Sequence, residues 1–157
     1  MKRPVKPIKN AAKAIIIREG AILALRKEDK DGVYYSLPGG GQEKGETLDA
    51  ALVRECVEEI GTEVEVRRLV FVRDYIGANH EFAKEDSEVH KVEFFFECRV
   101  PEIYRPRLGT KPDATQKSVV WLPLEETFDS MLYPRALCEY FAKLDDTSNP
   151  VYLGDIN

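Results

Sequence analysis

The sequence is poor in cysteine and has no long apolar run. Its three cysteines, Cys56, Cys98 and Cys138, are an odd number with no paired spacing. Two of them fall at apolar positions of periodic segments, which favours buried free thiols over a disulfide framework and predicts a reducing, cytoplasmic setting. The apolar run after the basic N-terminus is interrupted by Lys13 and stops at Arg18. We therefore expect neither a signal peptide nor a membrane span.

The chain also lacks an excess of positive charge. Its 23 lysines and arginines are outnumbered by 28 aspartates and glutamates, for a formal net charge of −5. Sequence-independent binding to polymeric nucleic acid needs a basic surface, so the charge argues against that class of partner. It does not exclude a small anionic substrate that is reached through a bound cation.

No internal repeat or second domain is visible, and the 157 residues suit one globular domain. We expect a basic N-terminal arm over residues 1–10, a domain over 11–144, and a loosely held polar C-terminal tail over 145–157. Apolar alternation and turn residues predict a hairpin over 11–25, further strands over 33–37, 64–76, 89–100 and 118–122, and helices over 47–61 and 134–144. This order predicts the α/β class, with a mixed sheet covered on both faces.

The stretch Gly39–Thr62, GGGQEKGETLDAALVRECVEEIGT, combines a glycine loop with an acidic helix. Thr47 is a plausible N-cap and Gly61 a natural C-terminal stop. Glu58 and Glu59 follow Glu55 at helical spacings of three and four, which places the three carboxylates on one face. Like charges at these spacings repel, so a bound cation is expected there.

The spacing of this stretch resembles the signature of the Nudix (MutT-like) hydrolases. Gly40 is followed by Glu46 and then by the run Arg54–Thr62, and every polar and glycine position of the signature is matched. Departures occur at two aliphatic positions, where Cys56 and Thr62 stand, and neither carries chemistry. The resemblance implies an α/β/α sandwich built on a mixed sheet.

The resemblance also implies a set of functional residues. Glu55, Glu58 and Glu59 are the expected Mg²⁺ ligands, with one of them free to serve as base and with Mn²⁺ able to substitute. The backbone carbonyl of Gly40 is expected to complete the coordination. Arg54 is expected to orient a glutamate by a charge-assisted hydrogen bond, which makes it the fourth catalytic residue. Carboxylate oxygens are the ligands that Mg²⁺ prefers, so the residue types agree with the implied role.

The reaction implied is hydrolysis of a nucleoside diphosphate linked to another moiety, such as ADP-ribose or a nucleotide sugar, by attack of water at phosphorus. Hydrolysis of damaged nucleoside triphosphates and non-catalytic nucleotide sensing remain as alternatives. Arg26, at a place where this fold often meets phosphates, and Tyr75, which could stack on a base, are the candidate substrate-binding residues. A homodimer is compatible with the sequence.

Five further polar residues receive supporting or ordinary roles. Glu46, near the start of the helix, is expected to be structural. Glu93 is expected to face solvent. Gln116 stands where many family members carry a glutamate, which argues against a carboxylate from that loop. His80 and His90 are expected to be surface or edge residues rather than metal ligands.

Overall fold

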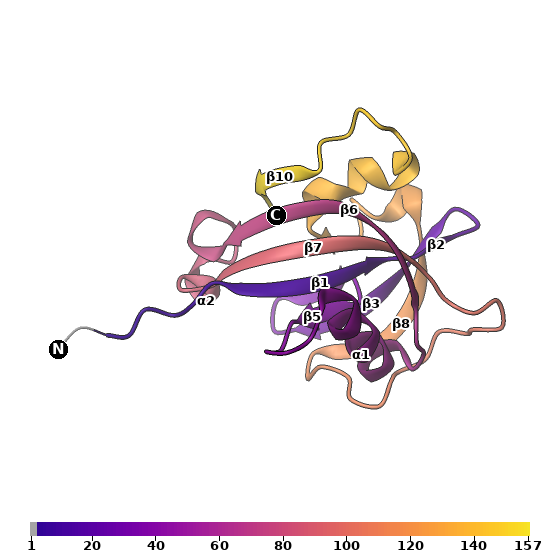
Figure 1. The fold of residues 1–157 in the computed structure, drawn as a ribbon, viewed down its shortest axis with the longest axis horizontal. Helices are drawn as coiled ribbons and strands as arrows, with labels where there is room; N and C mark the ends of the chain where they lie inside the picture. The colour runs from indigo at the N-terminus through magenta and orange to yellow at the C-terminus, as the bar shows by residue number, and fades with distance from the viewer. Residues whose placement is uncertain (1–2) are drawn as a thin grey trace.

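The computed structural model describes residues 3–157, which form two β-sheets with helical segments on both sides (Figure 1). The first sheet has the order β10 (Tyr152–Asp155), β6 (Glu65–Ile76), β7 (His90–Arg99), β1 (Lys9–Ile15) and β5 (Gly39–Gly41). The second has the order β2 (Ile17–Arg18), β3 (Ala21–Asp29), β4 (Gly32–Ser36) and β9 (Leu132–Tyr133), and β8 (Gln116–Pro123) pairs with β3. The helical segments are α1 (Leu48–Ile60), η1 (Gly77–Asn79), α2 (Ala83–Asp86), η2 (Leu124–Glu126) and η3 (Arg135–Lys143).

Both sheets contain parallel and antiparallel neighbours. β1 runs parallel to β7 and antiparallel to β5, whereas β4 is antiparallel to β3 and parallel to β9. α1 lies on one side of the strands and η3 on the other (Figure 1). The predicted α/β fold, a sandwich with mixed strand pairing covered on both faces, is confirmed. The structure adds that the strands divide into two sheets.

The division begins inside the expected N-terminal hairpin. The turn at Glu19–Gly20 is present, and β2 pairs with β3 through Ile17 and Ile22. The longer β1 instead joins the other sheet, with Lys9–Ile15 aligned to Lys91–Glu97 of β7. The hairpin prediction is therefore right for β2 and β3 but wrong for most of the first strand.

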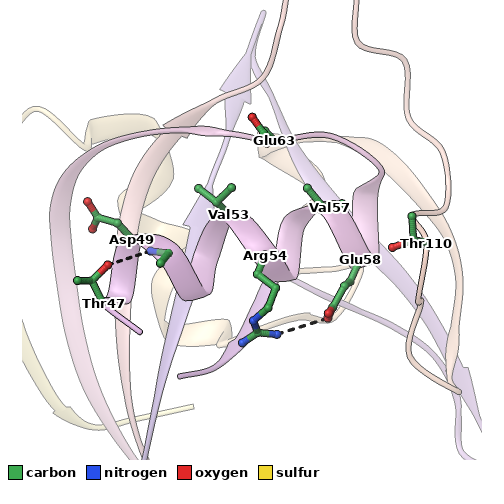
Figure 2. Close-up of a pocket in the computed structure, with 9 residues that line it drawn as sticks. Thr47, Asp49, Val53, Arg54, Val57, Glu58, Glu63 and Thr110 are labelled. Atoms are coloured by element: carbon green, nitrogen blue, oxygen red, sulfur yellow. Dashed lines mark hydrogen bonds and ion pairs between the residues drawn. The ribbon is translucent and has the colours of Figure 1, made fainter. Parts of the chain in front are cut away.

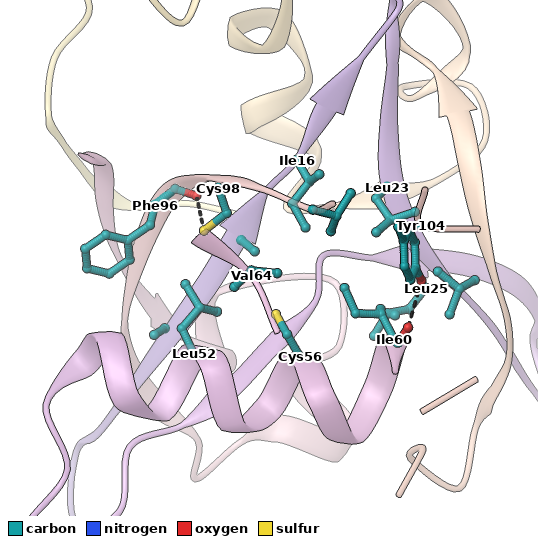
Figure 3. Close-up of a cluster of buried hydrophobic side chains, with 14 residues drawn as sticks. Ile16, Leu23, Leu25, Leu52, Cys56, Ile60, Val64, Phe96, Cys98 and Tyr104 are labelled. Carbon is teal, nitrogen blue, oxygen red and sulfur yellow. Dashed lines mark hydrogen bonds between the residues drawn. The ribbon is translucent and has the colours of Figure 1, made fainter. Parts of the chain in front are cut away.

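Two apolar clusters fill the layers on either side of the first sheet. Alternation on β7 sends Phe96 and Cys98 into the cluster beneath α1, shown in Figure 3, and Phe95 into the cluster beneath η3. The α1 side chains Leu52 and Ile60 are fully buried in the first cluster. Each such aliphatic side chain stabilises the fold by about 1.5–3 kcal/mol, which fixes α1 against the sheet.

The caps of α1 are those predicted. Thr47 accepts a hydrogen bond from the backbone N–H of Ala50 at 3.2 Å, and Gly61 ends the helix with φ +76°. Glu59 departs from the acidic face that it was predicted to share with Glu55 and Glu58, because it is 2% exposed. It follows the buried Cys56 by three residues and so lies on the inner side of the helix, whereas Glu55 and Glu58 are only half-buried.

The loop over 101–115 is hydrogen-bonded to the carboxyl end of α1. Backbone N–H groups of Gly109 and Lys111 donate to carbonyls of the last turn at 3.1 and 2.8 Å, and the Tyr104 hydroxyl donates to another at 2.8 Å. The buried side-chain amide of Gln116 donates to the carbonyl of Glu59 at 2.8 Å. These bonds satisfy carbonyls that a helix end leaves free, and they fix the backbone that carries Glu58 and Glu59.

The C-terminal region is more ordered than predicted. The expected helix over 134–144 is present as the 3-10 helix η3, with Leu137 and Phe141 buried. The expectation of a loosely held tail is wrong, since β10 pairs in parallel with the edge of β6. The Asp155 carboxylate accepts hydrogen bonds from the Ile76 backbone and the Asn79 side chain, both at 2.9 Å. No helix within residues 3–157 is long and apolar enough to cross a membrane.

Candidate active site

The glycine loop brings β5 against both β1 and α1. Gly39 has φ +132°, and a Cβ there would lie 2.1 Å from the Ala12 carbonyl oxygen. At Gly40, a Cβ would lie 2.5 Å from the carboxyl carbon of Glu55. The close approach to the Ala12 backbone requires glycine at position 39, and the Glu55 carboxylate occupies the space that a side chain at position 40 would take.

Arg54 links the loop to the acidic face of α1. Its guanidinium donates to Glu46 through Nε at 2.8 Å and Nη2 at 3.0 Å, to Glu55 at 3.1 Å, and to the Gly41 carbonyl at 3.0 Å. It also lies 3.6 Å from Glu58. The hydrogen bond from Arg54, with one from the backbone of Glu43, lowers the pKa of Glu46 to about 2. Glu46 thus anchors Arg54, in agreement with a structural role.

Burial sets the protonation of the inner carboxylates. Burial raises the pKa of Glu59 to about 7, against the opposing effects of the Lys13 charge and of a 2.7 Å hydrogen bond from the Gly39 backbone N–H. Burial also raises the pKa of Glu55, and the hydrogen bond from Arg54 opposes the shift. Both carboxylates are held in surroundings that favour an added positive charge.

Glu58 is more exposed than Glu59 and shares Arg54 with Glu55. With Arg54, Val53 and Val57 it borders a hollow of about 770 Å³ on the outer surface of α1, which Figure 2 shows together with the Arg54–Glu58 ion pair. Glu55 and Glu59 do not line this hollow. Its lining is mainly apolar, and apart from Glu58 and Arg54 none of the residues considered for the chemistry borders it.

The three glutamates fit a divalent metal ion by their chemistry. Within residues 3–157 no three acidic, histidine or cysteine side chains converge closely enough to form a ready-made metal site. Carboxylates are nevertheless the donors that Mg²⁺ prefers, and two of the three have raised pKa values because burial is not offset by enough positive charge. The absence of a side chain at Gly40 leaves room for the Glu55 carboxylate beside the loop. Glu55, Glu58, Glu59 and the Gly40 carbonyl are the groups that would hold the ion.

The two candidate substrate-binding residues are not brought into this cluster. Arg26 lies on β3, opposite Tyr35 and Ser118, and is 3.6 Å from Glu28. Tyr75 is 6% exposed, with its ring stacked on His80 at 5.6 Å between centroids and its hydroxyl donating to Asp86 at 2.7 Å. Little of the Tyr75 ring is left to stack on a base.

Glu93 is placed differently from its prediction as a solvent-facing residue. It is 4% exposed and accepts hydrogen bonds from Nε (2.8 Å) and Nη2 (2.5 Å) of Arg73. Burial opposes its ionisation, but the charges of Lys13 and Arg73 lower its pKa below the ordinary value. The alternation of β7 is correct, but both faces of the strand are covered, so the polar position is buried with a partner.

His80 and His90 each pair with an aspartate. His80 Nε2 lies 2.6 Å from Asp155, and His90 Nε2 lies 2.8 Å from Asp74. Neither ring belongs to the glutamate cluster, in line with the prediction that they are not metal ligands. Their partners are on β10 and β6, so these contacts hold the C-terminal strand and the sheet edge.

A second hollow, of about 490 Å³, lies between the β3–β4 turn and the α2 region. Its aromatic wall is formed by Tyr34, Phe82 and Tyr133, with ring centroids 6.4 Å apart for Tyr34–Tyr133 and 5.1 Å apart for Phe82–Tyr133. Lys91 of β7 and Asp86 of α2 complete part of the lining. An aromatic wall with charged neighbours can hold a planar ring or a sugar.

Comparison with known proteins agrees with this geometry. The NUDIX domain family model matches residues 7–138. The chain is similar to "Nudix hydrolase 16, mitochondrial" of Arabidopsis thaliana, with 36% identity over 130 residues covering 78% of this chain and 66% of that protein. It is also similar to "Nucleoside triphosphatase NudI" of Enterobacter sp. (strain 638), with 32% identity over 89 residues covering 54% of this chain and 63% of that protein. The chain thus spans somewhat less than two thirds of each relative.

A solved structure extends the likeness to the whole fold. The solution structure of the E. coli ORF135 protein superposes with a TM-score of 0.63 at 26% identity, covering 90% of this chain and 93% of that one. The family match includes the glycine loop, Glu46, Arg54 and the glutamates of α1. This chain belongs to the Nudix hydrolase family.

Proposed function

We propose that this chain is a Mg²⁺-dependent pyrophosphohydrolase that cleaves a nucleoside diphosphate linked to another moiety, such as ADP-ribose or a nucleotide sugar. The observation that carries the proposal is the set of carboxylates on α1, which Arg54 holds beside the glycine loop. The positive charge near them is too small to offset the effect of burial on the pKa of Glu59. Such a set suits a cation that in turn meets phosphate.

The chain's own residues would do three things in this reaction. Glu55, Glu58 and Glu59 would hold the metal ion with the Gly40 carbonyl, and one of them would take a proton from the attacking water. Arg54 would keep Glu55 and Glu58 in place through the contacts seen here. When bound, the ion supplies polarisation of the phosphoryl group and neutralises charge on the leaving phosphate.

The aromatic hollow supports a substrate with a ring system beyond the phosphates. Tyr34, Phe82 and Tyr133 offer ring surface, and this role replaces the stacking that we expected of the buried Tyr75. Arg26 stays a candidate for a phosphate contact, because its side chain is about one third exposed.

Hydrolysis of nucleoside triphosphates is the second candidate. It is favoured by the likeness to the protein described as nucleoside triphosphatase NudI, at 32% identity over 89 residues. The product distinguishes the two: a triphosphate would release pyrophosphate, whereas a sugar-linked diphosphate would release a phosphorylated sugar and a nucleoside monophosphate.

A panel of substrates tests the proposal. Purified protein is incubated with Mg²⁺ or Mn²⁺ and with ADP-ribose, nucleotide sugars and the nucleoside triphosphates, and products are identified by chromatography. We expect cleavage of a diphosphate-linked substrate that stops when the metal is chelated. Preferred release of pyrophosphate from a triphosphate would support the second candidate. Calorimetric binding of a nucleotide without any cleavage across the panel would overturn both and favour a sensor.

A further inference from the structure

Lys13 is a charged residue in the otherwise apolar stretch Ala11–Ile15 of β1. On β1 it stands between Ala12 and Ala14, and both alanines are fully buried. In register it lies opposite Gly39 of β5 on one side and Phe95 of β7 on the other. Lysine is rarely kept in such a position unless its charge is used, because placing it there costs side-chain entropy and solvation.

Its ammonium group lies next to the proposed metal ligands. Lys13 Nζ donates to the Gly39 carbonyl at 3.3 Å, and the N–H of the same Gly39 donates to the Glu59 carboxylate at 2.7 Å. The lysine and the glutamate therefore hold the two ends of one glycine residue. The Lys13 charge also opposes the rise in the pKa of Glu59 that burial causes, and it helps to lower the pKa of Glu93.

These neighbours leave hydrogen-bond donors of the ammonium group without an acceptor. This group can donate three hydrogen bonds. Over residues 3–157 its side chain has one acceptor within hydrogen-bond distance, the Gly39 carbonyl, and no carboxylate oxygen within 4.0 Å. Donors thus remain for a further acceptor at a half-buried position.

The direction in which Lys13 points indicates which acceptor could reach its ammonium group. Lys13 points away from the alanines that pack beneath α1, toward the face that carries Glu93 and Arg73. β5 is the edge strand of this sheet, and Glu59 reaches Gly39 from the α1 side. Lys13 therefore stands where the acidic side of α1 meets the polar face of the sheet. An anion seated against the glutamates' cation would have this ammonium as its neighbour.

We propose that Lys13 binds a phosphate oxygen of the substrate, as a residue outside the Gly40–Thr62 signature that helps to set substrate affinity. The inference rests on the proposed function for the identity of the anion. A purely structural lysine that only balances the charge of Glu59 and Glu93 is the competing explanation. The two differ in what happens to anion binding when the charge is removed but the apolar stem is kept.

The test compares Lys13→Met and Lys13→Arg with Lys9→Met as a matched control. Lys9 lies on the same strand and face, four residues earlier, and is exposed. The probe is methylenediphosphonate, which cannot be hydrolysed, titrated calorimetrically into each protein with Mg²⁺ present. We expect Lys13→Met to weaken binding roughly tenfold or more, the loss expected for one charge-assisted hydrogen bond. Lys13→Arg should recover most of it, and Lys9→Met should match the wild type.

The outcomes separate this inference from the proposed function. Unchanged binding by Lys13→Met would overturn the assignment, as would equal losses in Lys13→Met and Lys13→Arg that follow a lowered melting temperature. With a substrate from the panel, the same change should raise KM more than it lowers kcat. Loss of methylenediphosphonate binding in Lys13→Met together with no hydrolysis by the wild type would support the anion site and sink the proposed reaction.

Discussion

Burial removes water from a carboxylate and so destabilises its charged form. At the scale of single residues, Glu59 shows how this destabilisation can favour binding of a cation. Its side chain is 2% exposed and has the Gly39 N–H as a hydrogen-bond donor. A single neutral donor does not replace the lost water, so the pKa rises to about 7. A divalent ion would supply the missing charge. Glu46 is the opposite case, because its contacts with Arg54 keep it ionised.

The raised pKa of Glu59 gives the metal-free protein a defined pH dependence. Between the ordinary value of 4.5 and about 7, the folded chain keeps a proton that the unfolded chain releases. The contribution of Glu59 to the free energy of unfolding therefore falls as the pH rises through this window and levels off above it. In Glu59→Gln the fall is absent, so relative to the wild type this variant should gain about 3 kcal/mol or somewhat less between about pH 5 and about pH 8.

Urea unfolding in the presence of a chelator measures this difference. The variant and the wild type are compared at both ends of the window, where other groups contribute equally to each. A stability difference that is the same at both pH values would show that Glu59 is not protonated in the folded state.

At the scale of elements, the helix and the loop over 101–115 depend on each other. Tyr104, Gly109, Lys111 and Gln116 all donate to carbonyls at the end of α1. A Cβ at Gly109 would lie 2.3 Å from the Glu58 carbonyl oxygen, so this close approach requires glycine. The place where a carboxylate is often found in the family is thus occupied by an amide that caps the helix.

Tyr104→Phe tests the coupling between the loop and the helix. The change removes a buried 2.8 Å hydrogen bond to the Ile60 carbonyl and leaves the ring in place. We expect a loss of about 1–2 kcal/mol in the free energy of unfolding, measured by chemical denaturation. Tyr152→Phe is the control, because it removes a hydroxyl that donates to Asp74 at an exposed position, and it should change stability by less than about 0.5 kcal/mol. Equal effects of the two changes would contradict the coupling.

The elements with a strong local signal were predictable from the sequence. α1 is capped by Thr47 and Gly61 as expected, and β4, β6, β7 and β8 lie close to their predicted ranges. The order of strands within the sheets was not predictable from the sequence, because β1 pairs with β7, which follows it by some eighty residues. The pairing of β10 with β6 is equally remote, and its polar sequence resembles a free tail.

The candidate site was predictable as far as its spacing reached. Gly40, Glu46, Arg54 and the glutamates come from one continuous stretch, and the structure gives contacts among them. Glu59 is buried where α1 meets β5, so the periodicity of the helix alone wrongly placed its side chain on a shared acidic face. Lys13 was visible only as an interruption of an apolar run, and nothing local indicated that it would meet Gly39.

For the whole molecule, charge and family bear on the choice of partner. The chain has a net charge of −5. Most of it, residues 7–138, matches the NUDIX domain family model. Because the chain lacks an excess of positive charge, we expect counterion release to contribute little to any binding of a polymeric nucleic acid. Lys13 and Arg26 are the positions at which we propose contacts with phosphate, and so small a number suits a small substrate.

Binding to single-stranded RNA tests this prediction. Fluorescence anisotropy with a labelled homopolymer at a salt concentration of about 0.15 M should show no saturable binding by the protein. Saturable binding that weakens as salt is added would show a basic path along the surface and contradict the prediction.

The measurement that tests the central claim most directly is turnover by Glu58→Gln and Glu59→Gln with Mg²⁺, on whichever substrate the wild type cleaves. The change removes one negative charge and keeps the shape of the side chain. We predict that each variant stays folded and loses about a hundredfold or more in kcat, because in the proposed reaction these carboxylates would hold the metal ion that assists attack. Glu139→Gln, an exposed residue of η3 on the opposite side of the sheets, should keep wild-type turnover. Wild-type turnover in both Glu58→Gln and Glu59→Gln would contradict the assignment of the site.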